Sequence, residues 1–388
     1  MEIRFSERVK KVPPYLFARL DKMQAEARAR GADIISLSIG DPDLPTPDFI
    51  VKKMQEEVAV AKHHRYPSYE GSLEYREAVA RYYKRHFKVS LDPKNEILAL
   101  IGSKDGIAHT PLALIDSGDE VLVPSPGYPV YNVSTIFATG TTRFYPLLEK
   151  NSFIPDLDAL EKEPLDKVKL IWVNYPNNPT GAGATREFYK KLVEFARRNN
   201  IIVCADSAYL ELAFESDKRT SILEVEGAKE LAIEFGSLSK TYNMTGWRIG
   251  WAAGNEKLVS ALGQIKTNVD SGAFTAIQYA SITALDEGDE FIEENREIWR
   301  KRRDIFVEGL KKLGYSPFVP SGSFFVWVRT PKGVSSMNFV ERLLKERGVM
   351  CTPGVGFGEE GEGYIRFALT VGMERLKEAL ERIGKVNW

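Results

Sequence analysis

Short apolar runs and longer amphipathic stretches alternate through the middle of the chain. Residues 120–126 and 201–206 are apolar on both faces, whereas residues 185–200 have one apolar and one polar face. The first kind is typical of strands buried in a parallel sheet, and the second of the helices that cover it. The pattern therefore predicts an α/β domain with a mostly parallel seven-stranded sheet covered by helices on both sides. Its strands are expected at 96–102, 120–126, 142–147, 169–176, 201–206, 231–237 and 247–254, with helices at 104–118, 128–140, 185–200 and 255–266.

The pattern changes after about residue 274. A long, charged, amphipathic stretch at 290–314 predicts one extended helix. Beyond it, two strands and two shorter helices are expected, which indicates a smaller α+β domain. We therefore divide the chain into three parts, namely an N-terminal segment that packs with the small domain, a large domain and the small C-terminal domain, at residues 1–45, 46–286 and 287–388.

The composition excludes several classes of partner. The net charge of −1 over 388 residues gives no general attraction to nucleic acid or to an anionic membrane. Neither a secretory signal nor an apolar run long enough to cross a bilayer is present, and the two cysteines, Cys204 and Cys351, indicate no disulfide framework. These features favour a cytoplasmic protein. No metal site is expected, because metal-ligand spacing is absent from the four histidines, His63, His64, His86 and His109.

Polar residues gather where four of the predicted strands end. Ser103 and Lys104 follow the first strand, the run 174–178 ends another, Asp206 ends the next, and the run 237–240 follows the strand after that. In parallel α/β sheets, ligands bind beyond the carboxyl ends of the strands. These side chains are therefore expected to meet at one edge of the sheet.

The types of these residues point to one cofactor. A lysine beside another cation has a lowered pKa and can form a Schiff base, which suits Lys240 near Arg248. Hydroxyls, the guanidinium and a helix N-terminus suit a phosphate, and a buried Asp206 could hold a protonated ring nitrogen. Taken singly, each has a plainer interpretation: a surface lysine, a helix cap at Ser103, a turn aspartate, and a tight turn in NNPTG. Taken together, they describe pyridoxal 5′-phosphate (PLP).

The whole chain resembles the class I/II aminotransferases, which are PLP enzymes of fold type I with an aspartate-aminotransferase-like fold. The motifs that carry this resemblance are SIGDPD at 38–43, NYPNNPTG at 174–181, ADSAY at 205–209, SLSKTYNMTGWRIG at 237–250 and YIRFALT at 364–370.

The resemblance implies a role for each site residue. Lys240 would form the Schiff base and carry the proton between two carbons, with Asp206 at the ring nitrogen and Tyr209 and Asn178 at the ring oxygen. Arg366 would hold the substrate carboxylate, helped by Gly40 and Asn178. Tyr128 would stack on the ring, and the phosphate would be surrounded by Ser103, Lys104, Ser237, Ser239 and Arg248. Tyr66 matches a position that in relatives reaches the partner subunit's phosphate, which implies a homodimer with shared active sites.

The implied reaction moves an amino group between an L-amino acid and a 2-oxoacid, with glutamate and 2-oxoglutarate as one pair. A finer resemblance, carried by PPYLF, YPSYEG, IGSKDGIAH, TNVDSG and CTPGVGFGEEGEGYIRFALT, is to LL-diaminopimelate aminotransferases of lysine biosynthesis. Aspartate and alanine aminotransferases stay open as alternatives because they share the cofactor residues. A PLP lyase or synthase on the same fold is a further alternative. An effector-binding module of a transcription regulator is disfavoured, because the cofactor domain begins too early for a preceding helix-turn-helix domain.

Overall fold

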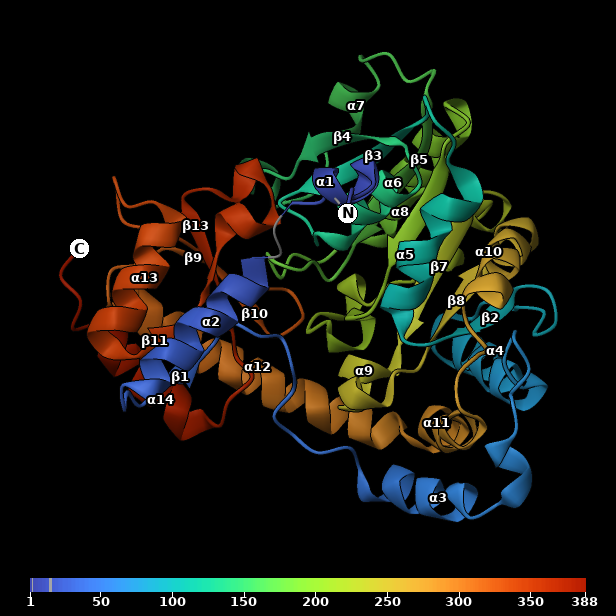
Figure 1. Ribbon diagram of the computed structural model, residues 1–388, viewed down its shortest axis with the longest axis horizontal. Coiled ribbons are helices and arrows are strands. Elements are labelled where there is room, and N and C mark those ends of the chain that lie inside the picture. Colours follow the sequence, from blue (N-terminus) through green and yellow to red (C-terminus); the bar gives the residue numbers. More distant parts are fainter. Residues whose placement is uncertain (2, 14–15) are drawn as a thin grey trace.

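A seven-stranded sheet forms the centre of the larger part of the molecule, shown in Figure 1. The computed structural model describes residues 1, 3–13 and 16–388, so Glu2, Pro14 and Tyr15, two of them in the PPYLF motif, lie outside the described residues. The strands are β2 (Ile97–Leu100), β3 (Glu120–Ser125), β4 (Thr141–Pro146), β5 (Val168–Asn174), β6 (Ile202–Asp206), β7 (Ala232–Ser237) and β8 (Gly250–Gly254). The prediction of a seven-stranded α/β sheet is thus confirmed.

The strand order is β2-β8-β7-β6-β5-β3-β4. Strand β8 is antiparallel to both of its neighbours, and the other pairs in the sheet are parallel. The predicted strand at 247–254 begins only at Gly250, because residues 245–247 form a 3₁₀ turn and Arg248 has a left-handed φ of 56°.

Helices cover both faces of this sheet, and the strand side chains alternate between them. In β2, Leu98 and Leu100 pack into one hydrophobic cluster, whereas Ile97 and Ala99 pack into the other. This two-sided burial explains why the strands are apolar on both faces. The helices of this part are α3 (Asp48–Val58), α4 (Leu73–Phe87), α5 (Ser103–Leu114), α6 (Val130–Phe137), α7 (Leu157–Leu160), α8 (Arg186–Arg198), α9 (Leu238–Thr241), α10 (Glu256–Val269) and α11 (Thr275–Glu287).

The smaller part of the molecule contains a four-stranded sheet in the order β12-β13-β10-β9, whose pairs are antiparallel. The N-terminal segment packs with this smaller part of the molecule. Ile35 pairs with Val349 in a separate two-stranded sheet, and Leu20 lies in the same hydrophobic cluster as Phe339. The division of the chain at residues 45 and 286 stays a prediction. The elements are α12 (Asp289–Lys312), β9 (Pro317–Phe318), β10 (Phe325–Arg329), α13 (Ser336–Arg347), β11 (Val349–Met350), β12 (Thr352–Pro353), β13 (Tyr364–Ala368) and α14 (Met373–Ile383), with α1 (Glu7–Lys11), α2 (Leu16–Ala29) and β1 (Ile35–Ser36) from the N-terminal segment.

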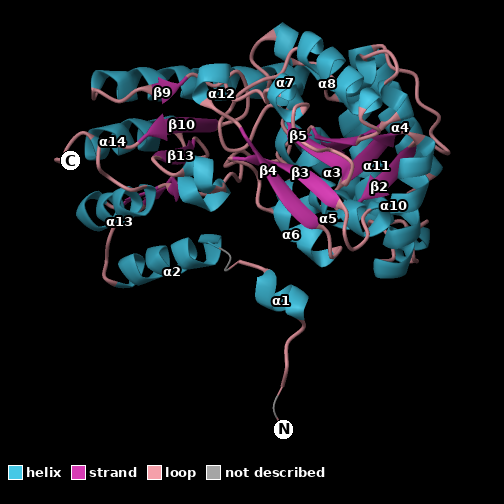
Figure 2. Ribbon diagram, turned by 90° about the horizontal axis from the view of Figure 1, so that it is seen from above, coloured by secondary structure: helices cyan, strands magenta, loops and turns pink. Residues whose placement is uncertain are grey.

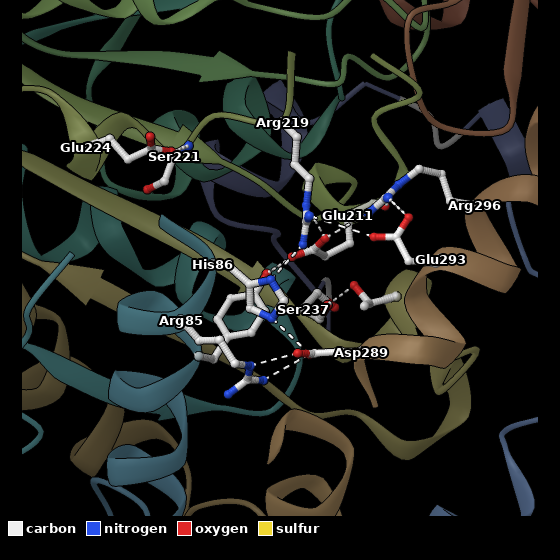
Figure 3. A network of polar contacts seen from close by, with 12 residues as sticks. Arg85, His86, Glu211, Arg219, Ser221, Glu224, Ser237, Asp289, Glu293 and Arg296 are labelled. Atoms are coloured by element: carbon white, nitrogen blue, oxygen red, sulfur yellow. Dashed lines mark hydrogen bonds and ion pairs between the residues drawn. The ribbon is translucent and has the colours of Figure 1, made fainter. Parts of the chain in front are cut away.

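Helix α12 runs from the large domain along the base of the molecule to the small domain (Figure 1). A network of charged side chains holds its first half against the large domain, as Figure 3 shows. The buried carboxylate of Glu211 pairs with Arg219 at 2.6 Å and with Arg296 of α12 at 3.3 Å. His86 lies 3.0 Å from Asp289, at the start of the helix. One rigid element therefore contacts both domains.

Within the part of the chain that the structure describes, no helix is both long enough and apolar enough to cross a membrane.

Candidate active site

A cavity of about 400 Å³ opens where the strands of the large sheet end. Every site residue predicted from the sequence lines this cavity except Tyr66, which is 88% exposed and lies elsewhere. Sequence reasoning missed several other residues in the lining: Asp21, Ile39, Ile107, Ala208, Thr245 and Phe325.

The sheet topology explains why these side chains meet. Parallel strands β5 and β6 end together, with Asn174 paired to Asp206. Strand β8 runs the opposite way, so its first residue, Gly250, pairs with Leu100 at the end of β2 and with Ser237 at the end of β7. The residues that precede β8, including Arg248, therefore reach the same edge as the residues that follow the other strands.

Lys240 projects from the short helix α9 into the cavity, where its Nζ donates a hydrogen bond to the Gly40 carbonyl at 2.8 Å. Burial lowers the pKa of this lysine to about 8, and the positive charges of Arg248 and Arg366 lower it as well, while Asp41 opposes the shift. Roughly a tenth of the amine is therefore uncharged at pH 7, far more than for an ordinary lysine, and the uncharged amine is the form that attacks a carbonyl.

Asp206 lies at the floor of the cavity and is 5% exposed. Its carboxylate accepts hydrogen bonds from the Tyr131 hydroxyl at 2.7 Å and the Ala208 N–H at 3.2 Å. Burial raises the pKa of Asp206 to about 6, and these two hydrogen bonds oppose the shift. Among the described residues Asp206 forms no ion pair, so a protonated ring nitrogen would supply its missing counter-charge.

The opposite end of the cavity is built to receive an anion. Helix α5 begins at Ser103, where the helix dipole and unpaired N–H groups favour negative charge. The Ser237 hydroxyl accepts from the Ser239 N–H at 3.1 Å, which leaves its own proton for a ligand. The Arg248 guanidinium packs against Gly102, where a Cβ would lie 2.3 Å from its Nη2. Burial, and then the charge of Arg248, lower the pKa of Lys104.

Arg366 is 3% exposed and reaches the cavity from β13 of the small domain. Its Nη2 donates to the Ser38 carbonyl at 2.5 Å, and its Nη1 donates to Asn178 Oδ1 at 2.7 Å. The Asn178 N–H in turn donates to Asn174 Oδ1 at 2.8 Å, and Asn174 Nδ2 donates to the Asp206 carbonyl at 2.9 Å. A chain of hydrogen bonds thus links the arginine to the buried aspartate.

Aromatic rings border the remaining walls. Tyr209 packs edge-on against Phe324 and Phe325, with ring centroids 5.6 and 5.5 Å apart. Burial raises the pKa of its phenol well above the usual value, so Tyr209 stays a neutral hydrogen-bond donor. Tyr128 lies edge-on to Tyr131 at 5.9 Å.

This set of groups fits PLP. The cofactor needs an amine for its aldehyde, an anion for its ring nitrogen, donors for its ring oxygen and a cradle for its phosphate. These four would be supplied, in a single cavity, by Lys240, Asp206, Tyr209 with Asn178, and the start of α5 with Arg248. The buried carboxylate of Asp206, which has no ion pair among the described residues, gives the clearest test of this fit. Burying an ionised carboxylate without a cation beside it costs free energy, and the protonated ring nitrogen would supply that cation.

Comparison with known proteins agrees with this geometry. The aminotransferase class I and II family matches residues 32–383. The LL-diaminopimelate aminotransferase of Maridesulfovibrio salexigens is 55% identical over 99% of this chain and 100% of its own, and that of Aquifex aeolicus is 53% identical over 99% of each. A single mutant of Thermus thermophilus aspartate aminotransferase superposes with a TM-score of 0.93 at 30% identity, covering 99% of this chain and 100% of that one. The chain therefore belongs to the class I and II aminotransferases and is a PLP-dependent enzyme that transfers an amino group between an amino acid and a 2-oxoacid.

Proposed function

We propose that the amino donor of this enzyme is LL-diaminopimelate, with 2-oxoglutarate as acceptor. Two relatives that match essentially the whole chain at 53–55% identity carry the name LL-diaminopimelate aminotransferase, whereas the aspartate aminotransferase structure is 30% identical. The observation that carries the proposal is this high identity along the full chain, joined to a cavity in which Lys240, Asp206 and Arg366 meet.

We propose the following roles at the ring end of the cavity. Lys240 would hold the cofactor aldehyde through its Nζ, and Asp206 would hold the ring nitrogen. Tyr209 and Asn178 would donate to the ring oxygen. Asn178 Oδ1 already accepts from Arg366, which leaves the Asn178 Nδ2 to donate. Tyr128 covers one face of the ring.

The anion site at the start of α5 would hold the phosphate. The proposed phosphate ligands all present hydrogen-bond donors at one end of the cavity, from hydroxyl, ammonium, guanidinium or backbone N–H groups. They are Ser103, Lys104, Ser237, Ser239 and Arg248.

Arg366 is the proposed site of the substrate α-carboxylate. A guanidinium presents two parallel N–H donors, which match the two oxygens of a carboxylate. The bonds to Ser38 and Asn178 hold this fork in place before substrate arrives. The Gly40 carbonyl, which accepts from Lys240, places the backbone of the 38–40 segment between the lysine and the arginine.

When bound, PLP acts as an electron sink for the bond that is broken at the substrate Cα. The residues of the chain supply the proton transfer. As a free amine of lowered pKa in the same cavity, Lys240 would accept the proton from the substrate Cα and return it at another carbon. Asp206, fixed by Tyr131, keeps a negative charge at the cavity floor.

We further propose that the enzyme is a homodimer with shared active sites. Tyr66 is exposed. So are other apolar or aromatic residues near it in sequence or between the end of α10 and the start of α11: Val58, Tyr69, Val269 and Phe274. The N-terminal segment also projects from the body of the molecule, as Figure 2 shows, and exposes Ile3, Phe5 and Val9. Exposed apolar surface of this kind is typical of a contact with another protein, and a second copy would cover it.

A panel of amino donors tests the substrate assignment. The purified enzyme, loaded with PLP, is given 2-oxoglutarate together with LL-diaminopimelate, aspartate or alanine, and glutamate formation is measured. We expect the highest kcat/KM with LL-diaminopimelate. A higher value with aspartate or alanine would refute the assignment, and ammonia release without a 2-oxoacid would show a lyase instead.

A further inference from the structure

Residues 37–43 form an irregular segment that lies between the Lys240 amine and the Arg366 guanidinium. Its Ser38 carbonyl accepts from Arg366 and its Gly40 carbonyl accepts from Lys240. The position of this segment therefore fixes where the carboxylate-binding fork stands relative to the amine.

Leu37 is bonded to the small domain, because its N–H donates to the Met350 carbonyl and its carbonyl accepts from the Ala368 N–H, both at 2.7 Å. Residues 38–43 make no such backbone bonds with the described part of the chain, so side-chain contacts must set their position. The hydroxyls of Thr352 and Thr370 hold the Ser38 and Ile39 carbonyls, each at 2.8 Å.

Arg302, on helix α12, supplies such contacts. Its Nη1 and Nη2 donate to the two oxygens of Asp43, at the end of the segment, at 2.6 and 3.0 Å. Its Nη1 also donates to the Leu369 carbonyl at 3.0 Å, just beyond the strand that carries Arg366. One guanidinium thus fastens the segment and the end of β13 to the same turn of α12.

The surroundings of Arg302 make this arrangement rigid. The side chain is 5% exposed, and its guanidinium lies over the Trp299 ring with 4.7 Å between Cζ and the ring centroid. A bidentate arginine–carboxylate pair fixes both distance and orientation. The first half of the same helix reaches the lysine, because Asn295 donates to the Thr241 carbonyl at 3.1 Å, one residue beyond Lys240. Helix α12 therefore contacts the segments that carry Lys240 and Arg366.

We propose that Arg302 is a positioning residue for the substrate carboxylate: it sets the place of Arg366 relative to Lys240 through Asp43 and the end of β13. This inference rests on the proposed role of Arg366. A misplacement of about 1 Å in an active site can lower the reaction rate roughly 100-fold. Displacement of the Arg366 guanidinium should likewise weaken carboxylate binding, without changing the phosphate end of the cavity.

The test uses the PLP-loaded enzyme and maleate, a dicarboxylate that has no amino or keto group to react. Maleate affinity is measured from the absorbance change of the bound cofactor, and PLP affinity by equilibrium dialysis. Arg302→Met should weaken maleate binding roughly 10- to 100-fold and leave PLP affinity within about twofold. Arg302→Lys should fall between, because one ammonium cannot bridge both Asp43 oxygens and Leu369. Arg300→Met, an exposed arginine on the same helix, is the control and should change neither.

A double-mutant cycle separates positioning from a merely structural role. If Arg302 acts through Arg366, then Arg302→Met should weaken maleate binding less than about twofold in an Arg366→Met background. An undiminished effect in that background, or a parallel loss of PLP affinity, would overturn the proposal. Normal maleate binding by Arg366→Met alone would instead overturn the carboxylate role of Arg366, and with it this inference. Should Arg302→Met fail to fold, Arg302→Lys and Asp43→Asn carry the same test, and both are expected to weaken maleate binding.

Discussion

The Tyr131 hydroxyl holds the charge of Asp206, and replacing it by Phe tests that interaction. The hydroxyl lies 2.7 Å from Asp206 Oδ2, and the ring stacks on Trp172 at 5.0 Å, so Tyr131→Phe removes the hydrogen bond and keeps the packing. A hydrogen bond to an ionised group contributes about 2 kcal/mol and one to a neutral group about 1 kcal/mol. The substitution should therefore destabilise the ionised form of Asp206 by about 1 kcal/mol more than the protonated form.

The sign of the pH dependence follows from the pKa of Asp206. Burial raises this pKa to about 6, from 3.8 for an exposed aspartate. A raised carboxyl pKa means that Asp206 favours folding below pH 3.8 and that this contribution is lost as the pH rises through 6. Tyr131→Phe should raise the pKa of Asp206 further. A difference of about 1 kcal/mol, at 1.36 kcal/mol per pKa unit, corresponds to slightly less than one unit, so the loss of this contribution continues to a higher pH. The cost of the substitution should thus grow from about 1 kcal/mol at pH 5 to about 2 kcal/mol at pH 8.

Thermal unfolding of the cofactor-free proteins measures this difference. Each kcal/mol should lower Tm by about 1–2 °C in a chain of this size, so the penalty should roughly double between pH 5 and pH 8. Tyr145→Phe is the control, because its buried hydroxyl donates to the Trp172 carbonyl at 2.6 Å and has no charged partner. Its penalty should be the same at both pH values. An equal or smaller Tyr131→Phe penalty at pH 8 would refute the interaction with an ionised Asp206.

Four further outcomes are expected. Borohydride should bleach the loaded enzyme and fix the cofactor to Lys240. When PLP is added to the cofactor-free protein, borohydride trapping of the PLP should rise as the pH passes about 8, because the lysine then loses its proton. Label found on another lysine by peptide mapping would overturn the site. Arg366→Met should raise the KM for 2-oxoglutarate roughly 100-fold or more, by loss of two charge-assisted hydrogen bonds, with the cofactor spectrum intact. Mixing inactive Lys240→Ala with Tyr66→Ala should form hybrid dimers more active than either parent, since one site then has both groups; no gain would place Tyr66 outside the partner's site. Glu211→Gln should lower the unfolding free energy by about 3–5 kcal/mol, because Arg219 and Arg296 lose their buried counter-charge; an effect no larger than that of the exposed control Glu297→Gln would contradict this.

The sheet and the part of the cavity lining that follows the strand ends could be predicted because both depend on local patterns. Apolar runs gave the seven strands, and the rule that parallel strands end at one edge gathered Asp206, Asn178 and Lys240. The antiparallel direction of β8 leaves no mark in the apolar pattern, although it is what brings Arg248 to this edge. Helices α3 and α4, which precede the first predicted strand, and helix α11, which lies between the predicted helices at 255–266 and 290–314, were among the elements not predicted.

Residues that reach the site from outside the strand ends were missed for a physical reason. Tyr131 lies on a helix among apolar neighbours, so it resembles an ordinary core tyrosine until the fold shows its hydroxyl against Asp206. Asp21 and Arg302 come from distant helices, and no local spacing relates them to the cavity. The hydroxyl of a buried tyrosine, which needs a polar partner, is the one signal that could have singled out Tyr131.

Two glycines bring main chain close together at the proposed phosphate site. A Cβ on Gly250 would lie 2.9 Å from the Ser103 nitrogen, so β8 can approach the start of α5 this closely only without a side chain, and Gly102 has a φ of 76° that favours glycine as well. The carboxylate end, in contrast, is made of side chains such as Arg366. Because any side chain at position 250 would collide with main chain, a saturation library should tolerate diversity at the outer rim of the cavity and almost none at position 250.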